Sequence, residues 1–104
     1  MNKLKYRLFL DKIKNPENYF HLTKNKIYFN DWSIVRNHYE FTNCIEVFGI
    51  PEIISFNTEF DDTYESIKWL CNHCLENKIK FPFYVIHSQK KNNDIDNYIQ
   101  NFKL

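Results

Sequence analysis

Alanine is absent from the 104 residues, and arginine occurs only at Arg7 and Arg36. Lys, Asn, Ile, Phe and Tyr together make up more than half of the chain instead. These are the residues that AT-rich codons specify, so the composition favours an AT-rich bacterium or one of its phages as the source. The same bias means that the abundance of Lys and Asn says little about chemistry.

Charge of one sign is also lacking, because 14 basic and 13 acidic residues leave a net charge of +1. Such a balance gives no electrostatic case for binding a phosphate backbone over a large surface. No apolar run approaches the roughly 20 residues that span a bilayer, and the first residues lack the apolar core and cleavage site of a signal peptide. The three cysteines are an odd number, which argues against a disulfide framework. We therefore expect a cytoplasmic protein that does not bind membranes.

What the chain does contain is enough apolar surface for a packed interior. Hydrophobic residues make up 43% and aromatic residues 18% of the sequence. The length suits one modest core, so we expect a single domain over residues 1–104. No internal repeat or low-complexity linker interrupts it.

Four short apolar runs predict strands at residues 5–10, 32–36, 52–56 and 82–86. After each of the last three runs, apolar residues recur at helical spacing. The three stripes are Phe41, Cys44, Ile45 and Phe48, then Ile67, Leu70, Cys71, Cys74 and Leu75, then Ile95, Tyr98, Ile99 and Phe102. Strands that alternate with helices predict an α/β fold with a mainly parallel sheet of four strands, or five as the alternative, and about three helices.

Capping signals support the predicted helices. Asn37 with Glu40 three residues later mimics a capping box, and Gly49 followed by Pro51 is typical of a helix end. At the second helix the candidates are Asp61, Asp62 and Thr63 for the start and Asn77 for the end.

Polar residues follow three of the predicted strands directly. They are Asp11 after the first strand, Asn57, Thr58 and Glu59 after the third, and His87 and Ser88 after the fourth. Ligands of open parallel sheets bind beyond the carboxyl ends of the strands, where the fold would gather these residues. That edge is the candidate functional site. The alternative is that strand ends are polar only because loops are polar.

An ordered set of short pieces covers nearly the whole chain and carries a family resemblance. The pieces are Leu8-Phe9-Leu10-Asp11, Pro16, the segment from Trp32 to Phe41, Gly49-Ile50-Pro51, Ile54-Ser55-Phe56, Tyr64, Lys68-Trp69-Leu70, Pro82 and His87-Ser88. In order and spacing they resemble the cyclic-phosphate-processing receiver domain, a receiver-like family common in phages and bacteria. The resemblance implies a receiver-type, flavodoxin-like three-layer sandwich.

The sequence departs from the family pattern at its acidic positions. The family has a pair of Asp after the first strand, where this chain has Asp11 and Lys12. Its Asp-His-Asp after the third strand is replaced by Asn57-Thr58-Glu59, and the Gly before the Tyr of the second helix by Thr63. The family's Asn-Pro after His-Ser is replaced by Gln89-Lys90-Lys91.

These departures weaken the site that the resemblance implies. A receiver-type acidic pocket holds a divalent cation through oxygen ligands, and its charge tunes the affinity. Asn57 removes a negative charge and Lys12 adds a positive one, so we expect no cofactor, weak Mg²⁺ binding at most, and no metal ligands. Asn57 also cannot accept a phosphoryl group as an aspartate would. If the site is active, the catalytic residues are Asp11, His87 and Glu59, with His87 as general acid or base oriented by Asp11. The ligand-binding residues are then Asn57, Ser88 and Lys12.

Other features have more than one interpretation. Cys71-Asn72-His73-Cys74, with Cys44 as a further thiol, could hold a metal, but all three cysteines lie on apolar stripes, which favours core packing. The aromatic residues between 19 and 32 could stack on nucleic-acid bases, cover the sheet edge or contact a protein. Lysines 24, 26, 90 and 91 could form a small basic patch or a solvated surface.

Two functional hypotheses follow. The first is a non-catalytic, receiver-like protein, a pseudoenzyme that acts by protein–protein interaction as a phage-encoded factor modulating or inhibiting a host defence system. The alternative is a residual phosphoesterase or a binding protein for cyclic phosphate, such as RNA 2′,3′-cyclic phosphate ends or cyclic nucleotides. The first predicts a protein partner and no role for His87, whereas the second predicts that His87→Ala abolishes turnover or ligand binding.

Overall fold

The computed structural model describes residues 6–18, 32–87 and 93–103. Within these ranges the elements are β1 (Arg7–Leu10), the short 3-10 helix η1 (Pro16–Asn18), β2 (Trp32–Val35), α2 (His38–Phe48), β3 (Ile53–Phe56), α3 (Asp61–Glu76), β4 (Phe83–Ile86) and α4 (Asn93–Lys103). Outside the described residues lie Ser88, the aromatic residues at 19–29 and the lysines at 24, 26, 90 and 91.

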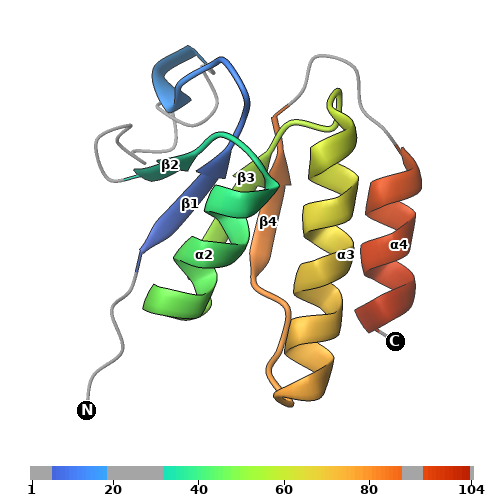
Figure 1. Ribbon diagram of the computed structural model, residues 1–104. Helices are drawn as coiled ribbons and strands as arrows, with labels where there is room; N and C mark the ends of the chain where they lie inside the picture. Colours follow the sequence, from blue (N-terminus) through green and yellow to red (C-terminus); the bar gives the residue numbers. More distant parts are fainter. Residues whose placement is uncertain (1–5, 19–31, 88–92, 104) are drawn as a thin grey trace.

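The four strands form one sheet in the order β2-β1-β3-β4, and every neighbouring pair is parallel (Figure 1). This confirms the predicted α/β fold with a parallel four-stranded, flavodoxin-like sheet. The register keeps the strands level, because Leu10 is paired with both Val35 and Phe56, and Phe56 with Ile86. The carboxyl ends of all four strands therefore lie in one row.

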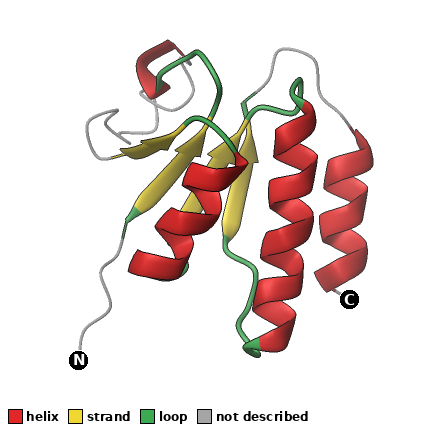
Figure 2. Cartoon of the chain, viewed as in Figure 1, coloured by secondary structure: helices red, strands yellow, loops and turns green. Residues whose placement is uncertain are grey.

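Helices α2, α3 and α4 cover one face of this sheet, as Figure 2 shows. Side chains alternate between the two faces of a strand, so Leu8 and Leu10 of β1 and Ile54 and Phe56 of β3 point toward the helices. They form the main core with buried residues of the three helices, which are Phe41, Ile45, Ile67, Leu70, Cys71, Cys74, Ile95 and Ile99. The described residues thus account for two layers of the predicted sandwich.

The capping residues of α2 do what the sequence predicts. The Asn37 side chain accepts a hydrogen bond from the backbone N–H of Glu40 at 2.8 Å, and the Glu40 carboxylate accepts one from the backbone N–H of Arg36 at 2.8 Å. These bonds satisfy N–H groups that have no partner within the helix. At the other end Gly49 adopts a φ of 89°, which favours glycine, and its N–H donates to the carbonyl of Ile45.

The start of α3 differs from the prediction. Its N-cap is Phe60, which makes no capping side-chain bond, and Asp61, Asp62 and Thr63 lie inside the helix. Two carboxylates in the first turn still complement the positive end of the helix dipole, so the acidic start is favourable without a side-chain cap. The predicted end at Asn77 is confirmed, because its N–H donates to the carbonyl of His73.

The three cysteines are free thiols. Cys71 and Cys74 are fully buried in the main core, and Cys44 is half-buried against it. The core interpretation of the Cys71–Cys74 motif is therefore confirmed. None of the helices in the described ranges is long and apolar enough to cross a membrane.

Candidate functional site

The level register brings Asp11, Asn57 and His87 together as the residues that follow β1, β3 and β4. Backbone bonds extend the sheet by one residue at this point: Asn57 N–H donates to the Leu10 carbonyl at 3.2 Å, and His87 N–H donates to the Phe56 carbonyl at 3.0 Å. The three side chains consequently lie side by side on the face of the sheet opposite the helices. The predicted convergence of these strand ends is confirmed for these three residues.

The carboxylate of Asp11 is the centre of this group. Its Oδ2 accepts hydrogen bonds from His87 Nε2 at 3.0 Å and from the Asn57 side-chain amide at 3.0 Å. Its Oδ1 accepts bonds from the backbone N–H groups of Ile13 at 2.9 Å and Lys14 at 3.0 Å. An ionised carboxylate offers about four acceptor positions, so these four donors use its capacity.

The hydrogen bonds decide the charge state of Asp11. Burial raises the pKa of this carboxyl, but the bonds from Ile13, Asn57, Lys14 and His87 lower it by more. The resulting pKa is about 2, compared with an ordinary value of 3.8. Asp11 is therefore a fixed anion at neutral pH, held by donors that stabilise its charged form.

His87 is fixed on three sides. Its Nε2 faces Asp11, its Nδ1 lies 2.7 Å from the hydroxyl of Ser55, and its ring stacks on Phe9 with centroids 4.3 Å apart and planes 6° from parallel. A neutral imidazole with the proton on Nε2 suits both bonds, because it donates to Asp11 and accepts from Ser55. We call these four residues, Asp11, Asn57, His87 and Ser55, the edge network.

Ser55 was not among the residues that the sequence singled out. It is the one hydroxyl within the apolar strand β3, and it lies two residues before Asn57 on the same face of the sheet. That spacing is the signal that could have found it. In the edge network, Ser55, His87 and Asp11 follow one another in the hydrogen-bonding order of a Ser-His-Asp triad.

Burial prevents the edge network from acting as a triad in this conformation. The side chains of Asp11 and His87 have exposed fractions of 0%, and the exposed fraction of Ser55 is 0%. A nucleophile and its base must touch the substrate, and neither Ser55 nor His87 presents surface for that contact. In this conformation the polar groups of the edge network bond to one another inside the protein.

Two of the remaining predicted site residues, Glu59 and Lys12, lie in the described part of the chain. The backbone N–H of Glu59 donates to the Asn57 side-chain oxygen at 2.8 Å, while the Glu59 side chain is exposed. The Lys12 ammonium lies over the Phe60 ring, 5.6 Å from its centre. Ser88 lies outside the described residues, so its predicted role stays a prediction.

A cleft of about 400 Å³ lies beside the edge network. Its polar lining comes mainly from the exposed Lys14, Asn18 and Glu59, with Asp11 and Asn57 at its base. The volume of this cleft lies within the range of small-molecule sites. Few of the polar groups in its lining, however, are both exposed to solvent and held in one position.

Arg36 also escaped the sequence analysis, although it is one of only two arginines and directly follows β2. Its guanidinium donates to the Asp11 carbonyl at 3.1 Å, to the Lys14 carbonyl at 2.6 Å and to the Asn15 side chain at 2.5 Å. These bonds fix the loop after β1, which in turn supplies two of the donors to Asp11.

The Asp11 carboxylate accepts N–H donors at both of its oxygens in this structure. A cation such as Mg²⁺ needs several oxygen ligands, whereas the acceptor positions of this carboxylate are filled by N–H groups. Within residues 6–18, 32–87 and 93–103, no group of three or more His, Cys, Asp or Glu side chains could hold a metal ion.

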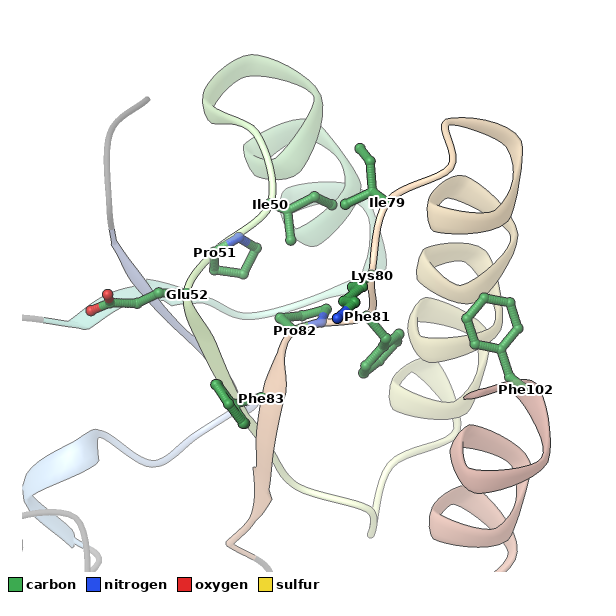
Figure 3. Close-up of a pocket in the computed structure, with 9 residues that line it drawn as sticks. All are labelled: Ile50, Pro51, Glu52, Ile79, Lys80, Phe81, Pro82, Phe83 and Phe102. Carbon is green, nitrogen blue, oxygen red and sulfur yellow. The ribbon is translucent and has the colours of Figure 1, made fainter. Parts of the chain in front are cut away.

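A second feature lies at the opposite end of the strands. An apolar groove of about 670 Å³ runs along the amino-terminal edge of β3 and β4 (Figure 3). Its lining is Ile50, Pro51, Glu52, Ile79, Lys80, Phe81, Pro82, Phe83 and Phe102. We call it the foot groove.

Exposed apolar side chains gather near the foot groove. Eight large apolar residues are exposed in the described part of the chain, and five of them lie at this end: Val47, Phe48, Leu75, Ile79 and Phe83. Phe83 has an exposed fraction of 81%. Apolar side chains that cluster at the surface mark interaction sites more often than single exposed ones do.

Comparison of the chain with known protein families, curated proteins and solved structures finds no match. The resemblance to the receiver-like family stays a prediction, and the function is argued from the geometry alone.

Proposed function

We propose that this chain is a non-catalytic, receiver-like protein that acts by binding another protein. The observation that carries the proposal is the enclosure of the edge network. The groups that a hydrolytic site would use, Asp11 and His87, have no exposed side-chain surface and are fully engaged with each other and with Ser55 and Asn57. A site that touched substrate would need at least one of them at the surface.

The foot groove supports the same proposal from the other end of the molecule. Its lining is mostly apolar, and Ile79 and Phe83 within it are exposed. Exposed aromatic and branched side chains around a concave surface provide the buried anchors that a protein interface needs. We therefore propose that the foot groove is where the partner binds.

The proposal extends to the setting. The AT-rich composition suits an AT-rich bacterium or one of its phages, and the role proposed is that of a phage-encoded factor that modulates a host defence system. Three free thiols suit the reducing environment of a cytoplasm.

Affinity capture from a host lysate with three matched variants tests the proposal. The double variant Ile79→Ser, Phe83→Ser removes the exposed anchors, His87→Gln alters the edge network, and Tyr39→Ser removes a side chain of 76% exposure at the other end of α2 as a control. We expect the wild type, His87→Gln and Tyr39→Ser to retain one common protein that the double variant loses. Circular dichroism checks that each variant is folded.

The alternatives to this proposal predict different results. Loss of the captured protein in a folded His87→Gln variant, with retention in the groove variant, would move the partner-binding site from the foot groove to the edge network, whereas the phosphoesterase predicts turnover that depends on His87. If the wild type captures no protein beyond those that an unrelated control protein also captures, the proposal is contradicted as well. The His87–Asp11 bond at 3.0 Å is the observation that keeps a phosphoesterase as the second candidate, and its test closes the Discussion.

A further inference from the structure

Strand β4 ends the sheet, and its outer side faces no described strand. The N–H and C=O groups of one residue point to the same side of a strand, and successive residues alternate. Because His87 N–H donates to the Phe56 carbonyl of β3, Val85 also points toward β3. The backbone groups of Tyr84 and Ile86 therefore point away from the sheet, at the open edge.

Within its four residues strand β4 carries no charged side chain, proline or bulge, although its shortness and the preceding Pro82 are features that limit pairing at sheet edges. Natural edges carry charged residues, prolines or bulges that discourage pairing with another chain. Strand β4 reads Phe-Tyr-Val-Ile, with Phe83 highly exposed and the next three residues half-buried. Pro82 precedes the strand and leaves the donors of Tyr84 and Ile86 in place. An apolar strand of this kind is suited to receiving an extended segment.

Helix α4 argues against a second copy of this chain as the occupant. The Tyr84 hydroxyl donates to the Asp96 carboxylate and accepts a bond from Gln100 at 2.6 Å, so α4 lies over β4. Paired strands lie about 4.8 Å apart, whereas packed helices need about 8–10 Å between their axes. Two copies joined through β4 would bring both α4 helices onto the same face at too short a separation. A segment without a helix of its own fits.

Charge near the foot of β4 indicates the character of that segment. Lys78 and Lys80 are exposed on the loop that leads into the strand, and Lys80 lines the foot groove. On the other side of the groove, Glu52 is paired with Arg7 at 3.4 Å, which neutralises its charge. Lys78 and Lys80 outnumber the one exposed carboxylate beside them, Glu76 at the end of α3, so an acidic residue of the partner would be favoured next to these lysines.

We propose that the open edge of β4 receives an extended apolar segment of a partner protein, with an acidic residue beside Lys78 and Lys80. Backbone groups of Tyr84 and Ile86 bond to the segment, and the foot groove takes its apolar side chains near Phe83. This inference rests on the proposed function, since it names how the protein partner is bound.

Hydrogen exchange in the free protein gives the first measurement. The amides of Tyr84 and Ile86 exchange faster than those of Val85 and His87, because only the latter point toward β3. A probe peptide of alternating Val and Thr with Glu at both ends is then titrated into the labelled protein. Binding protects Tyr84 and Ile86 from exchange and shifts their amide resonances.

Two sets of control peptides separate strand addition from apolar contact. One control peptide is methylated on the backbone nitrogen of every Val, and a second on that of every Thr. Because alternate residues of a strand point to opposite sides, each of these peptides lacks the N–H donors of one side. We expect one of these peptides to bind at least about tenfold more weakly, because it lacks the backbone donors that pair with the carbonyls of Tyr84 and Ile86. A peptide with Lys in place of Glu binds several-fold more weakly than the probe, and the double variant Lys78→Glu, Lys80→Glu reverses that preference.

Three results would overturn the proposal. Equal binding by all the methylated peptides would show apolar contact without strand addition, which leaves the proposed function intact. If the probe neither protects the amides of Tyr84 and Ile86 from exchange nor shifts their resonances, strand addition at β4 is refuted, and the proposed function is again left intact. If the free protein dimerises and the amides of Tyr84 and Ile86 are already protected from hydrogen exchange, the edge belongs to a second copy of the chain.

Discussion

Replacing Asp11 with asparagine keeps the shape of the side chain at the centre of the edge network but removes its charge. The asparagine oxygen can still accept the bonds from the backbone N–H groups of Ile13 and Lys14. Its amide nitrogen then faces two further donors, the Asn57 amide and His87 Nε2. Buried donors without acceptors cost about 1–3 kcal/mol each, so the two donors together should lower the free energy of unfolding of Asp11→Asn by about 2–6 kcal/mol at neutral pH.

The pH dependence of the free energy of unfolding gives an independent value for the stabilisation by the Asp11 charge. The folded pKa of about 2 lies below the ordinary 3.8, so the stabilisation by the Asp11 charge is fully present above the unfolded pKa. It is lost as the pH falls through the folded pKa, and the difference between the two pKa values corresponds to about 2 kcal/mol. The stability gap between the wild type and Asp11→Asn should therefore narrow by about 2 kcal/mol between about pH 5 and pH 2.

Urea unfolding followed by circular dichroism measures that gap at a series of pH values. Asp61→Asn removes an exposed carboxylate from the first turn of α3 and serves as the matched control. We expect the control to change the free energy of unfolding by less than about 1 kcal/mol. An Asp11→Asn variant as stable as the wild type, with the same pH dependence, would refute the description of the edge network.

Three further predictions concern the fold around the site. Tyr6→Phe removes a hydrogen bond to a backbone carbonyl at the end of α2 and should cost about 1 kcal/mol in urea unfolding. Burial also raises the pKa of Tyr6 far above 10, so the wild type should lose stability above about pH 10, where the unfolded tyrosine ionises first, and Tyr6→Phe should lose less. Burial raises the pKa of Cys71 to about 12 and that of Cys74 to about 11, so neither thiol should react with iodoacetamide at neutral pH until the protein unfolds, which mass spectrometry checks. Asn37→Ala removes the N-cap of α2 and should cost about 1 kcal/mol in the same unfolding assay, while Asn43→Ala at an exposed position within that helix should not destabilise. Equal stability of the two asparagine variants would contradict the capping interpretation.

Much of the fold follows from periodicity, because period and capping are local properties of the chain. The stripe that contains Phe41 and Ile45 predicts α2, and Asn37 and Gly49 mark its two ends, as the structure confirms. The apolar runs predict the strands, and their alternation with helices predicts a parallel sheet. The start of α3 is the exception, since Phe60 occupies the N-cap without a side-chain bond.

The candidate site was predictable in position but not in character. Topology alone places Asp11, Asn57 and His87 at one edge. Their enclosure depends on the register and on which face each side chain occupies, which no local pattern specifies. The spacing of Ser55 two residues before Asn57 indicates a shared face of the sheet, but its bond to His87 depends on the register between β3 and β4. The family resemblance pointed to lost carboxylates, whereas the structure shows what the remaining one does.

The most direct test of the central claim is turnover of 2′,3′-cyclic nucleotides by the purified chain, with and without Mg²⁺. The account predicts that the wild type hydrolyses these phosphodiesters no faster than His87→Ala, because the edge network is closed to substrate. Hydrolysis by the wild type that disappears in a folded His87→Ala variant would contradict it and would assign the edge network to catalysis.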